Sequence, residues 1–263
     1  MQLLRDWLPS PFLRCSAAFQ VVGGSAALLV PGGSHLLINA LAANHALVLG
    51  ASLWPTSPLL GPNLTRLSDE RAARGEIALT FDDGPDPKVT FEVLDLLDRY
   101  RAKASFFCIA ARAERSPELV KEILLRGHHI ENHTYRHAPT FALRGTKGLQ
   151  REIGHAQDVL TELAGVRPRY FRAPAGMRNP WLQGVLRRFD LSLVSWTRRG
   201  YDAVCRDPRK IARRLLRNLR GGDILLLHDG GSARDHRGRP VVLEVLARLL
   251  DTIASRDLTA TPL

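Results

Sequence analysis

Two adjacent aspartates, Asp82 and Asp83, stand where an apolar run gives way to a glycine and a proline. The run 77–79, followed by Gly84 and Pro85, predicts a buried strand that ends in a turn. Neighbouring side chains on an extended backbone point in opposite directions, so we expect the two carboxylates to do different jobs. Two like charges this close favour a cation between them. A metal site is our hypothesis; plain turn chemistry is the alternative.

Two histidines further along the chain are candidate ligands. The spacing of His133 and His137 places both imidazoles on one face if the segment is helical. His129 and His133 share this spacing, but residues 127–130 read as an extended segment, which turns His129 away. Surface histidines could also have this spacing by chance. Together with Asp83, the pair gives three protein ligands and leaves a position for water, the pattern of a catalytic zinc site.

Four motifs follow one another in order: Thr80-Phe81-Asp82-Asp83-Gly84, His133-Thr134-Tyr135-Arg136-His137, Arg172-Ala173-Pro174-Ala175-Gly176 and Leu226-Leu227-His228. In this order they resemble the polysaccharide deacetylase family, the NodB-homology domain of carbohydrate esterase family four. The resemblance covers roughly residues 75–250. It implies an α/β fold, a distorted (β/α) barrel with fewer than eight repeats and about seven strands. It also implies a hydrolase that removes N-acetyl groups from N-acetylglucosamine-containing glycans.

The resemblance assigns roles to the catalytic residues. Asp83, His133 and His137 would hold one divalent metal, expected to be zinc, which lowers the pKa of bound water to about 7. Asp82 would be the general base, and His228 the general acid that protonates the departing amine.

Arg172 would pair with Asp82 and keep it ionised and oriented; the alternative is a surface arginine before a proline turn. The metal and a backbone N–H near Ala175 would stabilise the oxyanion. The residues expected to contact substrate are Pro174, Ala175, Gly176 and Trp196. The family usually carries an aromatic residue in place of Ala175, so Met177 or Trp181 would have to supply the surface on which a sugar stacks.

The fourth family motif also differs here. It normally places an aspartate three residues after a strand-end tryptophan, where it tunes the acid histidine. In this chain Trp196 is followed by Arg199, which would lower the pKa of His228 if it were adjacent. Asp202 is the candidate to take over the tuning.

Three functions remain open at this point. The leading hypothesis is N-deacetylation of peptidoglycan, a chitin-like oligosaccharide or a lipid-linked saccharide. The second is an O-acetyl esterase, or a deformylase acting on a lipid-linked sugar. The third is a catalytically idle barrel that serves as a glycan-binding or membrane scaffold.

Strand-like and helix-like segments alternate from residue 76 onward, which is typical of parallel βα units. The expected strands are 76–81, 103–109, 128–132, 169–172, 191–196 and 223–228. The expected helices are 90–101, with Thr90 as N-cap, 117–126, 149–163, 180–189, 208–219 and 240–253. In a parallel barrel the carboxyl ends of all strands open onto one face, so the polar residues at those ends should converge there.

At 263 residues there is room for one large domain and an extension. A formal net charge of +11 favours an anionic partner such as membrane lipid or a cell-wall polymer. No basic run interleaved with aromatic residues is present, so we expect no nucleic-acid partner. The cysteines Cys15, Cys108 and Cys205 have no metal or redox spacing, and Cys108 is expected to end a buried strand.

Residues 1–68 are predicted to form an apolar, membrane-associated extension, and residues 69–263 the catalytic domain. Apolar stretches at 17–30 and 36–54 are near the lower length limit for crossing a bilayer. Arg5 and Arg14 precede the first stretch, which fits a cytoplasmic N-terminus if that stretch spans. One span would put the domain outside and two would return it to the cytoplasm, with the cell envelope the expected location. A soluble helical cap is the alternative.

Overall fold

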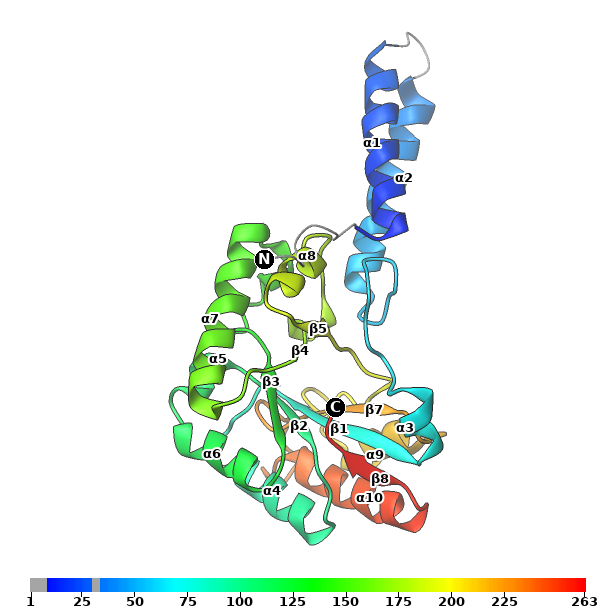
Figure 1. Ribbon diagram of the computed structural model, residues 1–263. Coiled ribbons are helices and arrows are strands. Elements are labelled where there is room, and N and C mark those ends of the chain that lie inside the picture. The colour runs from blue at the N-terminus through cyan, green and yellow to red at the C-terminus, as the bar shows by residue number, and fades with distance from the viewer. Residues whose placement is uncertain (1–8, 30–33) are drawn as a thin grey trace.

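The computed structural model describes residues 9–29 and 34–263, and a curled parallel sheet lies at the centre of the protein (Figure 1). Seven strands run in the order β5-β4-β3-β2-β1-β7-β6, and the short β8 pairs with the start of β1. The strands are β1 Glu76–Asp82, β2 Ser105–Cys108, β3 His129–Asn132, β4 Tyr170–Phe171, β5 Ser192–Leu193, β6 Arg198–Arg199, β7 Ile224–His228 and β8 Thr259–Thr261. The predicted fold class, an incomplete barrel with fewer than eight repeats, is confirmed.

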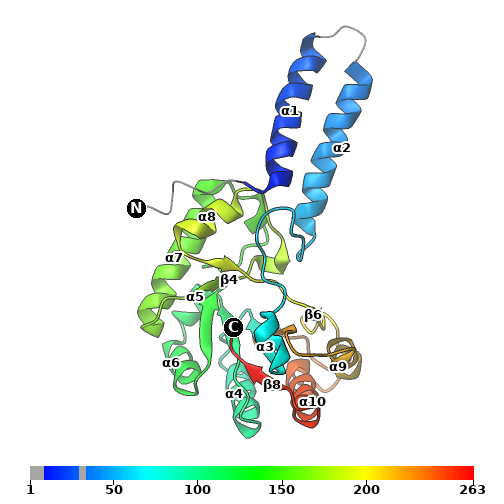
Figure 2. The same cartoon turned by 45° about the vertical axis from the view of Figure 1, so that its right-hand side comes forward.

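Helices cover the outer face of this sheet (Figures 1 and 2). They contact one another in the order α9, α10, α4, α6, α7, α8. Their bounds are α4 Val89–Arg99, α6 Pro117–Leu125, α7 Thr146–Ala164, α8 Leu182–Arg188, α9 Pro208–Leu216 and α10 Val241–Ser255. Two shorter helices, α3 Asp69–Ala73 and α5 Ala110–Ala113, lie at strand ends. The helices bury one face of the sheet, and the curling of the sheet on itself buries the other. The strand sequences are therefore almost continuously apolar.

Alternate residues of β1 face two different environments. Ile77, Leu79 and Phe81 belong to the main hydrophobic core beneath the helices. Ala78 belongs to a smaller cluster on the inner side of the curl. The two-residue period of a strand therefore directs Asp82 toward the same interior. This is how an apolar strand delivers a carboxylate to the inside of the barrel.

The strand register brings the expected site residues to one edge of the sheet. Asp82 lies opposite His228 of β7 and opposite Phe107 of β2. Asn132, the last residue of β3, lies opposite Phe171 of β4. His133 and Arg172 are the next residues after those two strands, so both follow at the same edge.

The segment 64–67 fills the gap between β5 and β7. The Leu64 N–H donates to the carbonyl of Leu193, and the Ser195 N–H donates to the carbonyl of Leu64. Arg66 and Arg198 both pair with Asp223, which is fully buried. Segment 64–67, predicted to belong to the extension, therefore packs as part of the barrel wall.

Two further expectations differ from the structure. Thr90 is inside α4 rather than at its N-cap; Asp86 Oδ1 instead accepts hydrogen bonds from the N–H groups of Lys88 and Val89. The sequence also did not predict the two-residue β6 and the three-residue β8. Strands of two or three residues are too short to show the alternation of apolar and polar residues by which a strand is predicted. Cys108 ends β2 and is buried, as expected.

Two apolar helices, α1 Pro11–Leu29 and α2 Ser34–Leu53, project from the domain as an antiparallel pair (Figures 1 and 2). Both are long and apolar enough to cross a membrane. Between the two helices, Asn44 Nδ2 donates to Ser16 Oγ over 2.9 Å, and Gly23 faces the side chain of Leu41. Arg5 and the connection 30–33 lie outside the described residues.

We predict that Asp223→Ala destabilises the fold by roughly 2–4 kcal/mol, because two partly buried guanidinium groups lose their carboxylate. The melting temperature, followed by tryptophan fluorescence in a mild detergent, should fall by about 5–10 °C. The matched control is Asp158→Ala on the exposed face of α7, which should melt like the wild type. Equal melting temperatures for the two variants would show that Asp223 does not hold the wall together.

Candidate active site

Asp82 and Asp83 diverge as predicted. Asp82 is the last residue of β1 and is 4% exposed, whereas Asp83 has a left-handed backbone with φ of 69°. Arg172 Nη1 donates to Asp82 Oδ1 over 2.6 Å. Asp83 Oδ1 instead lies 3.3 Å from Nε2 of His133 and 3.3 Å from Nε2 of His137. The two carboxylates thus have separate partners.

The segment from His133 to His137 is a loop, so the helical form that the His133–His137 spacing would suit is not adopted. Thr134 and His137 both have positive φ angles, 66° and 54°. Two side chains shape the loop: Asn132 Oδ1 accepts from the Thr134 N–H, and Thr134 Oγ1 accepts from the His137 N–H. The imidazoles nevertheless come together, with ring centroids 4.8 Å apart.

Asp83, His133 and His137 form a cluster whose ligand atoms all lie within 4.8 Å of one another. Asp83 Oδ1 is buried and has no hydrogen-bond partner among the described residues. The His133 Nδ1–H donates to the Arg172 carbonyl over 2.9 Å, which leaves the Nε2 lone pair facing Asp83. An orphaned carboxylate oxygen and an imidazole held in this tautomer fit a divalent metal.

Arg172 is the largest fully buried side chain in the described part of the molecule. Besides Asp82, its guanidinium binds Thr80 Oγ1 over 2.9 Å and the Ser195 carbonyl over 2.9 Å. It also lies 4.0 Å from the centroid of the Phe107 ring. The surface alternative for Arg172 is therefore wrong, and the group fixes Asp82 from inside the barrel.

His228 and Asp202 form a second buried pair. The His228 Nδ1–H donates to Asp202 Oδ1 over 2.9 Å, and the His228 backbone N–H donates to Asp202 Oδ2 over 2.7 Å. Burial alone would lower the pKa of His228, but the hydrogen bond and charge of Asp202, aided by Asp82 and Asp83, raise it to about 9. Arg199 lies over the rings of Trp196 and Tyr201.

The residues expected to contact substrate occupy different environments. Pro174, Gly176 and Trp196 are buried, and only Ala175 is exposed. Ala175 has a φ of 54°, and its N–H donates to none of the described residues. A Cβ on Gly176 would lie 2.6 Å from Pro55 and 2.7 Å from Trp196. The turn is therefore tightly packed, with one backbone donor left free.

Trp181 lines a different pocket from the one beside the cluster. It is exposed and lines an apolar pocket of about 580 Å³ together with residues of α1 and α2. Met177 is half-buried. Sugar stacking by either residue remains a prediction.

Sequence reasoning missed the residues that pack against the turn at Asp83 and Gly84, namely Asp229 and Gly230. A Cβ on Gly230 would lie 2.2 Å from the Asp83 carbonyl oxygen, and one on Gly84 would lie 2.1 Å from Asp229 Oδ2. Asp229 is buried, accepts a hydrogen bond from the Thr90 hydroxyl, and has its pKa raised to about 7 by burial. The glycines that follow acidic residues in Asp82-Asp83-Gly84 and Asp229-Gly230 were the available signal.

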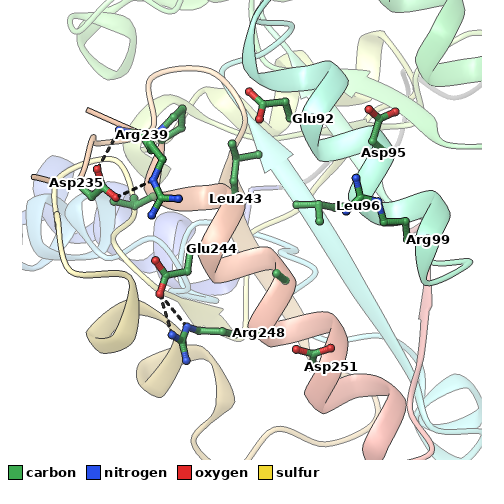
Figure 3. Close-up of a pocket in the computed structure, with 13 residues that line it drawn as sticks. Glu92, Asp95, Leu96, Arg99, Asp235, Arg239, Leu243, Glu244, Arg248 and Asp251 are labelled. Carbon is green, nitrogen blue, oxygen red and sulfur yellow. Dashed lines mark hydrogen bonds and ion pairs between the residues drawn. The ribbon is translucent and has the colours of Figure 1, made fainter. Parts of the chain in front are cut away.

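A larger groove of about 830 Å³ lies elsewhere, between α4 and α10 (Figure 3). Two ion pairs join charged side chains of its lining. Arg239 pairs with Asp235, and Arg248 pairs with Glu244, as the dashed lines in Figure 3 show. Exposed pairs of this kind are typical of a solvated surface.

Comparison with known proteins identifies the family. The family model described as polysaccharide deacetylase matches residues 69–194. The chain is 38% identical to a peptidoglycan-N-acetylglucosamine deacetylase of Bacillus cereus over 160 residues, which are 60% of this chain and 74% of that protein. It is 33% identical to a chitooligosaccharide deacetylase of Azorhizobium caulinodans over 197 residues, 72% of this chain and 93% of that protein.

A solved structure supports the same conclusion. A family 4 acetyl xylan esterase from Clostridium thermocellum, in complex with a cobalt ion, superposes with a TM-score of 0.63 and 28% identity. The superposition covers 71% of this chain and 87% of that one. With the incomplete parallel barrel and four motifs gathered at one strand edge, the chain belongs to the polysaccharide deacetylase family, carbohydrate esterase family four, and is a hydrolase of that family.

Proposed function

We propose that this protein is a metal-dependent hydrolase that removes N-acetyl groups from N-acetylglucosamine-containing glycans. The observation that carries the proposal is the convergence of three groups at one edge of the sheet: the cluster of Asp83, His133 and His137, the Asp82–Arg172 ion pair, and the His228–Asp202 pair. A metal site, a proton acceptor and a proton donor are the parts that amide hydrolysis requires.

Asp83, His133 and His137 would hold one divalent metal, and zinc suits their nitrogen and oxygen donors. When bound, the metal supplies Lewis acidity, which lowers the pKa of water and polarises an acetyl carbonyl. The cobalt ion in the related esterase supports a divalent ion in this family.

Asp82 is placed to accept a proton. Its Oδ1 is held by Arg172, while its Oδ2 lies 3.9 Å from His133 Nε2 and so faces the cluster. We assign Oδ2 as the general base. His228 would donate a proton from Nε2 to the departing amine, since Asp202 occupies Nδ1. The free N–H of Ala175 would stabilise the oxyanion.

We predict that the wild type, incubated with a chitin-like oligosaccharide or peptidoglycan fragments, releases acetate and free amines in equal amounts by mass spectrometry. Asp82→Asn should keep stoichiometric metal yet lose at least about a hundredfold in kcat, because it removes only the base. His133→Ala should lose both metal and turnover. Near-normal rates for Asp82→Asn would disprove the base assignment, and full activity in chelator would disprove metal dependence.

The pH dependence tests the acid. His228 must be protonated to act, so activity should fall as pH rises through its pKa, which Asp202 raises. Asp202→Asn removes that charge, and the alkaline limb of kcat/KM should move to lower pH by about one unit or more. The control is Asp158→Asn on α7. An unmoved alkaline limb in Asp202→Asn would refute the pairing as the source of the acid.

O-acetyl ester hydrolysis is the second candidate. The acetyl xylan esterase among the relatives supports it, and an alkoxide leaving group needs less protonation than an amine. Rates on matched N-acetyl and O-acetyl oligosaccharides separate the two activities.

We further propose that the extension within residues 1–68 anchors the catalytic domain to a membrane of the cell envelope through α1 and α2. Its last part, segment 64–67, belongs to the barrel wall, so the domain begins before residue 69. Helices of 19 and 20 residues extend about 28–30 Å, which matches the hydrocarbon core of a bilayer. Large apolar side chains such as Val22, Leu28 and Leu36 are exposed on them. Both helices crossing would place the domain on the side of the N-terminus, and Arg5 and Arg14 favour the cytoplasmic side.

Fractionation tests this anchor. The full chain should remain with membranes after a carbonate wash, and Val22→Lys should release part of it because a central lysine costs about 2.5–3.5 kcal/mol on insertion. The matched control is Leu125→Lys on α6, also an exposed apolar residue but on the catalytic domain, which should stay with membranes. Recovery of the wild type in the soluble fraction would contradict the anchor.

A further inference from the structure

A pocket of about 470 Å³ opens beside the metal-ligand cluster, and arginines line it. Asp83 and His137 form one wall. Arg112, Arg115 and Arg136 contribute the charged part of the remainder. The only carboxylate in the lining belongs to Asp83, which is already committed to the histidines. The pocket is therefore strongly positive next to the proposed reaction centre.

These arginines are available to a ligand. Elsewhere in the chain Arg66, Arg126 and Arg198 pair with carboxylates. Within the described residues, none of the pocket's three arginines forms such a pair. Three guanidinium groups that converge without counter-charges repel one another, so an anion between them would be favourable.

The arginines come from two segments that the fold brings together. Arg112 and Arg115 follow β2, whereas Arg136 lies in the loop after β3, one residue before His137. Arg112 is half-buried and anchored, because its Nη1 donates to the Asp83 carbonyl over 2.6 Å. Gly230 leaves the space that this guanidinium occupies. Arg115 and Arg136 are exposed, and Arg136 lies over the ring of Tyr135.

We propose that this pocket binds an anionic substituent, a phosphate or a carboxylate, on the ring carbon next to the one that bears the acetamido group. The inference rests on the proposed deacetylase function. Because Asp83 and His137 belong both to the cluster and to the pocket lining, an acetamido group at the cluster would bring its nearest neighbours on the ring, the substituents on the two flanking carbons, to this pocket. Arginine is the side chain best suited to both anions, because its planar fork can donate two parallel hydrogen bonds. The preferred substrate is thus a charged amino sugar.

The test compares three disaccharides built on the same two N-acetylated hexosamine rings that differ in their anionic substituent. They are di-N-acetylchitobiose, its 1-phosphate, and the N-acetylglucosamine–N-acetylmuramic acid disaccharide, which carries a carboxylate in the lactyl ether on the other flanking carbon. The wild type should show a kcat/KM for at least one anionic compound about tenfold or more above that for the neutral one. The two anionic arms distinguish phosphate from carboxylate. The preference should shrink between about 50 mM and about 500 mM salt, because exposed charges are screened.

In the double variant Arg115→Ala/Arg136→Ala, the anionic-to-neutral ratio of kcat/KM should fall toward one, mainly through KM. Arg213→Ala, an exposed arginine on α9, is the matched control and should keep the ratio. Calorimetric binding of the three compounds to Asp82→Asn supplies a readout that does not depend on turnover.

Two outcomes overturn the inference: a wild type with no preference for either anion, or a double variant that keeps the preference. One form of the second outcome is a double variant that loses binding to anionic lipid vesicles while its anionic-to-neutral ratio of kcat/KM stays unchanged. This result also overturns the inference, because it assigns the arginines to binding a membrane surface. Absence of turnover on all three compounds and on longer glycans would instead refute the proposed function, and the calorimetric arm would still decide whether the pocket selects anions.

Discussion

The buried ion pair between Arg172 and Asp82 is the constraint on which the rest of the site depends. The guanidinium lies inside the barrel against the ring of Phe107 and also binds Thr80 and the Ser195 carbonyl. Removing one partner of such a pair typically costs about 3–5 kcal/mol, because the other charge is left buried. Strand β1, the exit from β4 and the segment after β5 must therefore meet in one arrangement. That arrangement fixes the free oxygen of Asp82 beside the histidine cluster.

The two central histidines are oriented by the same physical device. In each, Nδ1–H donates to a fixed acceptor, the Arg172 carbonyl for His133 and the Asp202 carboxylate for His228. The Nε2 atom of His133 then lies 3.3 Å from Asp83 Oδ1, where a metal would bind. In His228 the Asp202 carboxylate raises the pKa and favours the protonated ring. The same type of side chain can thus serve as a ligand in one place and as an acid in the other.

The helical extension is joined to the same edge of the barrel. Pro55, just after α2, accepts a hydrogen bond from the Ser195 hydroxyl and packs against Gly176. The Arg178 N–H donates to the carbonyl of Ser52 in α2 itself. An anchor attached at the third motif would hold the mouth of the site near the membrane. A charged, membrane-proximal glycan would be consistent both with this placement and with the arginine-lined pocket.

The sequence by itself determined the strand-end aspartates, the order of the motifs and the family fold, because these depend on local alternation, turn residues and contiguous motifs. It also indicated the three candidate metal ligands, although through a helix that does not form. Only the tertiary structure decided that Asp202 reaches His228, that Arg112 touches Asp83, and that segment 64–67 completes the wall. Each of these contacts joins residues far apart in the chain, so no local hydrophobic periodicity in the sequence indicates it. The sequence offered Asp202 only as a candidate partner of His228 and gave no sign of the other two contacts, because the curl of the sheet sets the distances between strand ends.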